Sequence, residues 1–224
     1  PAQAAAHLRL ANLDLERGRT AEALVGLETA YRLGARHEQL PQTIAELYLQ
    51  LGDAPEAAAW YERAALLRPA GAAEFALRRA QLLLSIDDLE AAADAATEAV
   101  KSNDAAHQRQ AHVILGHVAS KQGKDALAVE HWTKAAELGD TTPDLQAFLG
   151  THYFNAGNHA LAARHLRKRL EHAPRDAQLQ EYLILSLLRS AKPEEARREL
   201  RTYIEQFGLD ARARELVASL TASP

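Results

Sequence analysis

Cysteine is absent from the 224 residues of this chain, which excludes disulfide bonds, cysteine-ligated zinc and a thiol nucleophile. Methionine is absent as well, even at position 1, and we therefore expect the sequence to be a segment excised from a longer protein. Aromatic residues make up only 5% of the chain, which disfavours a β-rich fold. No apolar run approaches the length of about 18 residues that a membrane-spanning helix needs.

The residues that are present favour helices joined by short turns. Alanine makes up roughly a fifth of the chain and is the strongest helix former. The net charge of -4 offers no basic footprint for nucleic acid, so we do not expect nucleic acid as a partner. Most of the 26 basic residues are arginine, and together with the alanine content this is typical of a bacterium with a GC-rich genome.

A turn sequence recurs six times along the chain, and each copy ends at an alanine five residues after it begins. The copies begin at Gly18, Gly52, Asp87, Gly123, Gly157 and Ala191. Their spacings are 34, 35, 36, 34 and 34 residues. A fixed period of this size indicates a solenoid of stacked repeats.

Each repeat is predicted to consist of two amphipathic helices. In the fifth repeat, Leu149 and Tyr153 share one helical face, and Gly157 ends the helix. A second helix follows with Ala162 and Leu166 on its buried face. The alanine near the start of the second helix allows the two helix axes to approach closely.

These positions resemble the tetratricopeptide repeat (TPR) family, whose pattern is W-x2-L-G-x2-Y, then A-x3-F, then P, over 34 residues. Repeat 2 carries the resemblance through Ile44, Ala45, Tyr48, Ala57, Tyr61, Ala64 and Pro69; repeat 5 carries it through Leu149, Gly150, Tyr153, Ala162 and Pro174. The resemblance covers residues 4–208. It implies an all-α fold, a right-handed α-solenoid of about six helix-turn-helix repeats that forms a single domain over residues 1–224. The expected repeats are 4–37, 38–72, 73–108, 109–142, 143–176 and 177–208.

A C-terminal helix is predicted over residues 210–221. Ala213, Leu216, Val217 and Leu220 form one apolar stripe along it. This helix is either a cap that covers the last repeat or the first helix of a truncated seventh repeat.

Repeat 3 departs from the pattern, because Arg79 stands where a leucine is usual. We expect its aliphatic stem to pack against the repeat and its guanidinium to reach water.

No motif for catalysis or metal binding is present. The chain lacks a glycine-rich phosphate loop, a G-x-S-x-G elbow and an H-E-x-x-H pair. His107, His112 and His117 are five residues apart, which rotates successive side chains by about 140° around a helix and prevents their convergence. We expect the histidines, including His165, to be exposed polar residues, and we predict no enzyme activity, no metal and no cofactor.

The resemblance implies that the first helix of each repeat lines a concave groove that binds a protein or peptide. The candidate partner-binding residues at the groove positions are Arg9, Asn12, Gln42, Glu46, His117, Lys121, Phe148, Phe154, Asn155, Tyr182 and Arg189. We expect the main anchor at Phe148, Phe154 and Tyr182, while the alternative is that the phenylalanines fill space between repeats. The lysine, asparagine and arginine set with which chaperone-binding members hold a terminal carboxylate is missing, as is the asparagine ladder of sugar-transferase members.

The sequence therefore predicts a non-enzymatic protein–protein interaction scaffold. A narrower hypothesis is the periplasmic TPR part of a bacterial exopolysaccharide export machine, linked to biofilm formation. The alternative is a regulatory peptide-binding domain of a larger enzyme or sensor. On this basis a periplasmic location is favoured over a cytoplasmic one, and the partner and oligomeric state stay open.

Overall fold

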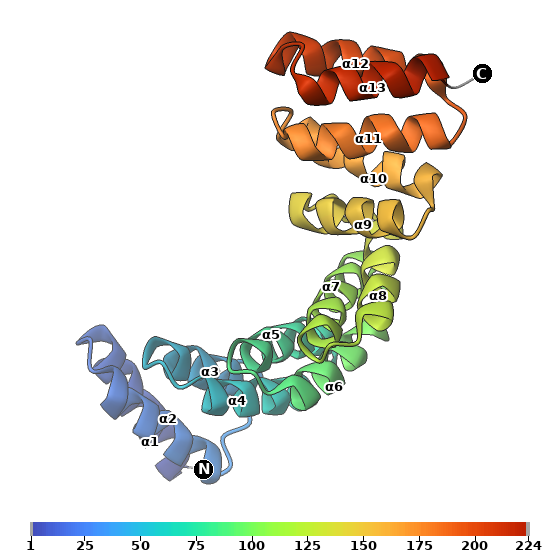
Figure 1. Ribbon diagram of the computed structural model, residues 1–224. Helices are drawn as coiled ribbons and strands as arrows, with labels where there is room; N and C mark the ends of the chain where they lie inside the picture. Colours follow the sequence, from blue (N-terminus) through green and yellow to red (C-terminus); the bar gives the residue numbers. More distant parts are fainter. Residues whose placement is uncertain (1, 223–224) are drawn as a thin grey trace. The chain divides into compact units, whose positions relative to one another are not determined.

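The structure is a computed structural model that describes residues 2–222, and over this range every ordered element is a helix (Figure 1). It has thirteen α-helices and one short 3-10 helix over the described range, which confirms the prediction of an all-α fold with about thirteen helices. The α-helices are α1 (Ala2–Glu16), α2 (Thr20–Arg32), α3 (Leu40–Gln50), α4 (Ala54–Leu67), α5 (Ala72–Ser85), α6 (Leu89–Val100), α7 (Ala105–Lys121), α8 (Asp125–Glu137), α9 (Pro143–Asn155), α10 (His159–His172), α11 (Ala177–Arg189), α12 (Pro193–Phe207) and α13 (Ala211–Ala222). The 3-10 helix η1 (Pro69–Gly71) lies between α4 and α5.

The helices form two compact units, which divide between Leu138 and Gly139. Unit 1 contains α1 to α8 and unit 2 contains α9 to α13. Within each unit, an odd-numbered helix packs against the even-numbered helix that follows it, as in α1 with α2 and α9 with α10. The described residues therefore form six helix pairs followed by one further helix. No helix within residues 2–222 has both the length and the apolar composition that crossing a bilayer requires.

The six recurring turns share one backbone conformation. Gly18, Gly52, Gly123 and Gly157 have φ between 70° and 80° at these turns. Asp87 and Ala191 occupy the equivalent position in the other two turns, with φ of 60° and 57°. The left-handed conformation ends the first helix of each pair and reverses the chain into the second. The sequence period therefore corresponds to a repeated backbone geometry.

Small residues set the distance between the paired helices, as the sequence predicted. The six alanines that follow the turns are at most 1% exposed: Ala23, Ala57, Ala92, Ala128, Ala162 and Ala196. A methyl group at Gly116 would overlap with the indole ring of Trp132. A methyl group at Gly150 would lie 2.7 Å from Cδ2 of Leu166. A large residue in one helix thus occupies the space that a small residue leaves in its partner.

Unit 1 contains two clusters of buried apolar residues. The first centres on Ile44, Trp60 and Tyr61, and its members come from α1 to α5. The second extends from α4 to α7 and is lined largely by alanines of α5 and α6.

The Arg79 side chain lies between two carboxylates that the sequence analysis did not predict. The Arg79 side chain is 14% exposed, and its Nη1 lies 3.6 Å from carboxylate oxygens of both Glu62 and Glu98. Because α5 lies between α4 and α6, the arginine reaches one glutamate from each neighbouring helix, and both of these carboxylates are more than half exposed.

Unit 2 has one cluster of buried residues, which extends from α10 to α13 and is built on Leu166, Leu183, Ile184 and Leu187. The C-terminal helix α13 adds Ala213, Leu216 and Leu220 to this core. Val217 was expected on the same stripe but is 38% exposed, because it lies beside the buried line of the helix rather than on it.

Candidate partner-binding face

The predicted residues Phe154, Tyr182 and Arg189 meet where α9 packs beside α11 in unit 2. The rings of Phe154 and Tyr182 stack with centroids 4.6 Å apart and planes inclined by 20°. The guanidinium of Arg189 lies over the Phe154 ring, 5.2 Å from its centroid. We call these three residues the aromatic face. Both aromatic residues are half-buried, so they combine packing in the repeat with an accessible surface.

Phe148 and Asn155 lie on the same helix as Phe154. Phe148 is 38% exposed, and its ring stacks on His152 one turn later at 6.2 Å with an angle of 12° between the planes. Asn155 is the last residue of α9 and is exposed. Apolar and amide side chains are therefore available along α9 beside the aromatic face.

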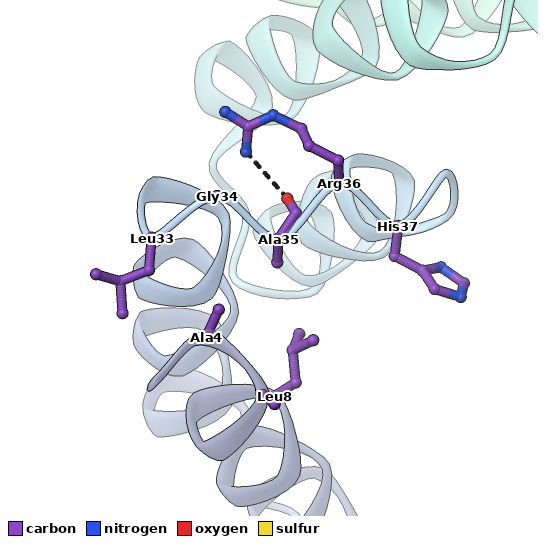
Figure 2. A pocket seen from close by; sticks show the side chains of 8 residues that line it. Ala4, Leu8, Leu33, Gly34, Ala35, Arg36 and His37 are labelled. Atoms are coloured by element: carbon purple, nitrogen blue, oxygen red, sulfur yellow. Dashed lines mark hydrogen bonds between the residues drawn. The ribbon is translucent and has the colours of Figure 1, made fainter. Parts of the chain in front are cut away.

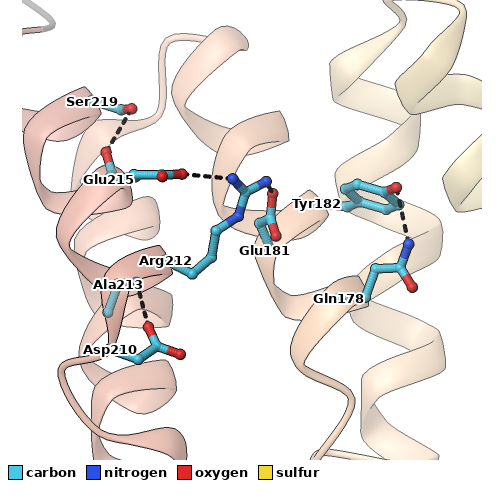
Figure 3. Close-up of polar contacts among 8 residues, drawn as sticks. All are labelled: Gln178, Glu181, Tyr182, Asp210, Arg212, Ala213, Glu215 and Ser219. Atoms are coloured by element: carbon cyan, nitrogen blue, oxygen red, sulfur yellow. Dashed lines mark hydrogen bonds and ion pairs between the residues drawn. The ribbon is translucent and has the colours of Figure 1, made fainter.

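Polar contacts are made on both sides of α11 (Figure 3). Gln178 donates a hydrogen bond to the hydroxyl of Tyr182 over 3.1 Å, which fixes the ring that stacks on Phe154. Arg212 of α13 bonds to Glu181 of α11 and, at 2.6 Å, to Glu215 of its own helix. These bonds link α13 to α11 and neutralise both carboxylates.

The predicted residues of α1 and α3 are polar but are not brought together, because these two helices share no contact over the described range. Arg9 and Asn12 are exposed on α1. Gln42 is half-buried: its amide donates to Glu46 at 2.9 Å and accepts a hydrogen bond from Arg68 at 3.2 Å. The Gln42 amide is therefore already engaged by its neighbours.

The predicted residues of α7 are exposed, and both have neighbours within unit 1. The imidazole of His117 meets the Trp132 ring edge to face at 5.4 Å. Lys121 forms an ion pair of 2.6 Å with Asp87, at the turn between α5 and α6. This ion pair joins two repeats, which gives Lys121 a structural role in addition to any contact with a partner.

A pocket of about 530 Å³ lies at the start of unit 1 and contains none of the predicted residues (Figure 2). Ala4 and Leu8 of α1 form one wall, and the connection from α2 to α3 forms the other through residues 33–37. Arg36 in that wall donates to the backbone oxygens of Tyr31 and Ala35, at 2.7 and 3.0 Å. The guanidinium of Arg36 is therefore hydrogen-bonded to the backbone of its own connection. The pocket is lined mainly by apolar side chains.

The sequence analysis missed a half-buried contact between two histidines. The Nδ1 atoms of His112 and His131 lie 3.1 Å apart between α7 and α8. Burial and the neighbouring ring lower the pKa of His112, and burial lowers the pKa of His131. The two residues are 19 apart in sequence. Only an alignment of the facing positions of the two paired helices could have predicted their contact.

His165 contradicts the expectation of an exposed histidine. It is only 5% exposed, and its Nδ1 donates to the amide oxygen of Gln146 at 2.8 Å. The amide of Gln146 donates in turn to the backbone oxygen of Asp140 at 2.7 Å. Burial, with the charges of Arg164 and Lys168, lowers the pKa of His165 to about 4. The imidazole is therefore a neutral, hydrogen-bonded part of the core at pH 7.

Within residues 2–222, no group of three or more histidine, cysteine, aspartate or glutamate side chains is arranged to hold a metal ion.

Comparisons with known proteins agree with the repeat pattern. Residues 42–70 match the tetratricopeptide repeat family model. Among solved structures, the chain is similar to pilF of Pseudomonas aeruginosa, with 17% identity, a TM-score of 0.56, and coverage of 96% of this chain and 97% of the other. A MamA double mutant has 22% identity and a TM-score of 0.57 over 75% of this chain and 93% of its own. YrrB, a TPR protein with an unusual peptide-binding site, has 18% identity and a TM-score of 0.54 over 86% of this chain and 97% of its own.

No curated protein sequence matches the chain. At these identities the structural likeness concerns the fold. The chain thus has the helical solenoid fold of TPR proteins, and its second repeat carries the sequence of the TPR family.

Proposed function

We propose that this chain is a non-enzymatic protein-interaction scaffold that binds a peptide segment of its partner on the aromatic face of unit 2. The observation that carries the proposal is the stack of Phe154 on Tyr182 with Arg189 above it. Aromatic residues and arginine are the side chains most enriched at binding hot spots. The TPR fold supports the same conclusion, because stacked repeats form extended binding surfaces.

The geometry favours a peptide over a compact small molecule. The described aromatic contacts run along the surface of two neighbouring helices, α9 and α11, rather than around an enclosed cavity. A surface of this kind binds side chains one after another, with a few anchors and a polar rim. Phe148 and Asn155 extend the contact along α9, and the predicted residues of α1, α3 and α7 are separate candidates in unit 1.

A peptide-display selection on the whole chain tests the proposal. We expect enriched peptides to lose affinity by about 2 kcal/mol or more for each true anchor that is truncated, among Phe148, Phe154 and Tyr182. A matched control replaces Arg9, Asn12 and Glu46 with alanine and should leave the affinity unchanged. Peptides that depend on the control residues and ignore the three aromatic residues would contradict the proposal.

Truncation of Phe154 and Tyr182 also removes packing against the core of unit 2. Far-UV circular dichroism must therefore show that each variant stays folded. Crosslinking from a photoreactive group on the enriched peptide gives a second readout that needs no variant. Crosslinks confined to α9 and α11 support the proposal, and crosslinks confined to α1 and α3 overturn it.

The cellular setting is a finer part of the proposal. We propose periplasmic export of exopolysaccharide as that setting, on the composition of the sequence alone, and the alternative is a regulatory domain of an enzyme or sensor. The comparisons favour neither setting. Fractionation of cells that make the full-length protein distinguishes the two settings. A periplasmic protein without a catalytic or sensor domain supports export, and a protein with such a domain supports regulation.

A further inference from the structure

The cation of the aromatic face lacks an ionic partner over the described range, whereas carboxylates on α11, α12 and α13 have one. Within residues 2–222, Arg189 is exposed and forms no ion pair. Glu181 and Glu215 are both bonded to Arg212, as Figure 3 shows. Glu195 pairs with Lys192 and Arg167. These three carboxylates are thus neutralised by other cations, and the charge of Arg189 has no counterpart among the described ion pairs.

The position of Arg189 is fixed by a ring rather than by a carboxylate. Its guanidinium lies 5.2 Å from the centroid of Phe154, within the range of a cation–π contact. His159 meets the other part of this ring edge to face, with centroids 5.7 Å apart. Contact with the ring leaves the N–H groups of the guanidinium, which lie in its own plane, able to donate to an incoming anion.

His159, which also contacts the Phe154 ring, does not contribute a second positive charge. Its Nδ1 is buried and has no hydrogen-bond partner among the described residues. Burial and the charge of Arg189 lower the pKa of His159, which keeps the imidazole neutral. The cation available at the aromatic face is therefore Arg189.

We infer that Arg189 binds the side-chain carboxylate of an aspartate or glutamate in the partner, next to an apolar residue that packs on Phe154 and Tyr182. This inference rests on the proposed function and specifies the partner as an acidic–apolar peptide segment. Arginine and a carboxylate form two parallel hydrogen bonds, which adds orientation to the attraction of opposite charges. An internal side chain suits the site better than a chain terminus, because one cation is present and a clamp spread over three repeats is missing.

The experiment selects peptides with both ends blocked from a random display library, on the whole chain. We expect enriched peptides to place aspartate or glutamate beside an aromatic or aliphatic residue. Replacing that acid with its amide, or Arg189→Gln in the protein, should each weaken binding about tenfold. The two changes together should cost little more than either alone, because both remove one shared contact.

Charge reversal gives the sharper readout. Arg189→Glu should abolish the preference for acidic peptides and enrich peptides with lysine or arginine at the same place. Arg197→Glu is the matched control, since Arg197 is an exposed arginine of the neighbouring helix α12 that is paired with Glu194. The control should leave the selected sequences unchanged.

The outcomes separate this inference from the proposed function. Peptides that need Phe154 and Tyr182 but show no acidic preference overturn the inference and leave the proposed function standing. Binding that appears only when the peptide has a free C-terminus also overturns it, in favour of a terminal carboxylate. The absence of any enriched peptide that depends on the aromatic residues contradicts both.

Discussion

One left-handed backbone conformation recurs at the turn of every helix pair. Glycine adopts it in four turns, and residues with a Cβ atom, Asp87 and Ala191, adopt it in the other two. Gly157 adopts it in the fifth pair without strain, whereas Ala191 adopts it in the sixth with φ of 57°. A residue with a Cβ atom pays roughly 1–2 kcal/mol for this left-handed conformation. Glycine avoids this cost, but it loses more backbone entropy on folding, which offsets part of its advantage.

We therefore predict that Ala191→Gly stabilises the protein, by up to about 1 kcal/mol. The reciprocal change Gly157→Ala, at the same position of the preceding repeat, should destabilise it by about 1 kcal/mol. Urea denaturation followed by circular dichroism measures both. A loss of stability for Ala191→Gly would show that the turn of the sixth repeat is not strained.

The buried imidazole of His165 links stability to pH. Its pKa is lowered to about 4 by burial and by Arg164 and Lys168, while Gln146 and Tyr153 contact the ring from α9. An unfolded histidine has a pKa of about 6.5, so the unfolded state binds more protons between these two values. This contribution to stability is complete above pH 6.5 and is lost as the pH falls through 4.

We expect protonation of His165 to lower the free energy of unfolding by up to roughly 3 kcal/mol as the pH falls from 6.5 to 4. This value follows from the difference between the pKa of the folded and unfolded states. His165→Gln should flatten that part of the stability curve relative to the parent protein. His172→Gln removes an exposed histidine from the same helix and should leave the curve unchanged. Parallel curves for the parent and His165→Gln would refute the prediction.

At the scale of elements, the helix pairs depend on small residues that face large ones. Gly150 in α9 is an example, because a Cβ atom there would lie 2.7 Å from the side chain and 3.2 Å from the backbone nitrogen of Leu166 in α10. Glycine in a helix is normally worse than alanine by about 1 kcal/mol. The close approach of the two helices reverses this preference.

Gly150→Ala should accordingly destabilise the protein by about 1–3 kcal/mol, although it raises helix propensity. Shortening the opposing side chain in the double variant Gly150→Ala with Leu166→Val should recover part of the loss. Chemical denaturation of the two variants and the parent provides the measurement. A stabilised Gly150→Ala protein would mean that α10 can move away from α9 at no cost.

At the scale of the whole molecule, the chain comprises two units that each contain their own buried residues. The core of unit 2 draws its members from α10 to α13, with packing from α9, and all of them lie after Leu138. Because repeat proteins gain stability from contacts between neighbouring repeats, a unit with a complete core can fold alone.

We predict that residues 139–224, produced alone, form a helical domain that unfolds cooperatively. Far-UV circular dichroism and thermal melting test this directly. Leu183→Ala, which truncates a side chain that is 1% exposed in the unit 2 core, should lower the melting temperature of the fragment. A fragment without helical signal would show that the core of unit 2 depends on residues before Gly139.

The sequence by itself determined the helix pairs, the turns and the small residues at the helix contacts. These features depend on local rules: a period of 34 to 36 residues, a helix stop at Gly157 and its equivalents, and alanine where two backbones approach. It also indicated α9 and α11 as elements of the candidate site, since Phe148 and Tyr182 stand at corresponding repeat positions, 34 residues apart.

Only the tertiary structure decided which side chains touch. The burial of His165, the proximity of His112 to His131, and the position of Arg79 between Glu62 and Glu98 all depend on contacts between different helices. Helical periodicity places a residue on a face, but the rotation and separation of neighbouring helices determine whether that face meets water, a carboxylate or a ring. The position of Arg189 over Phe154 was decided in the same way, because it depends on how α11 packs beside α9.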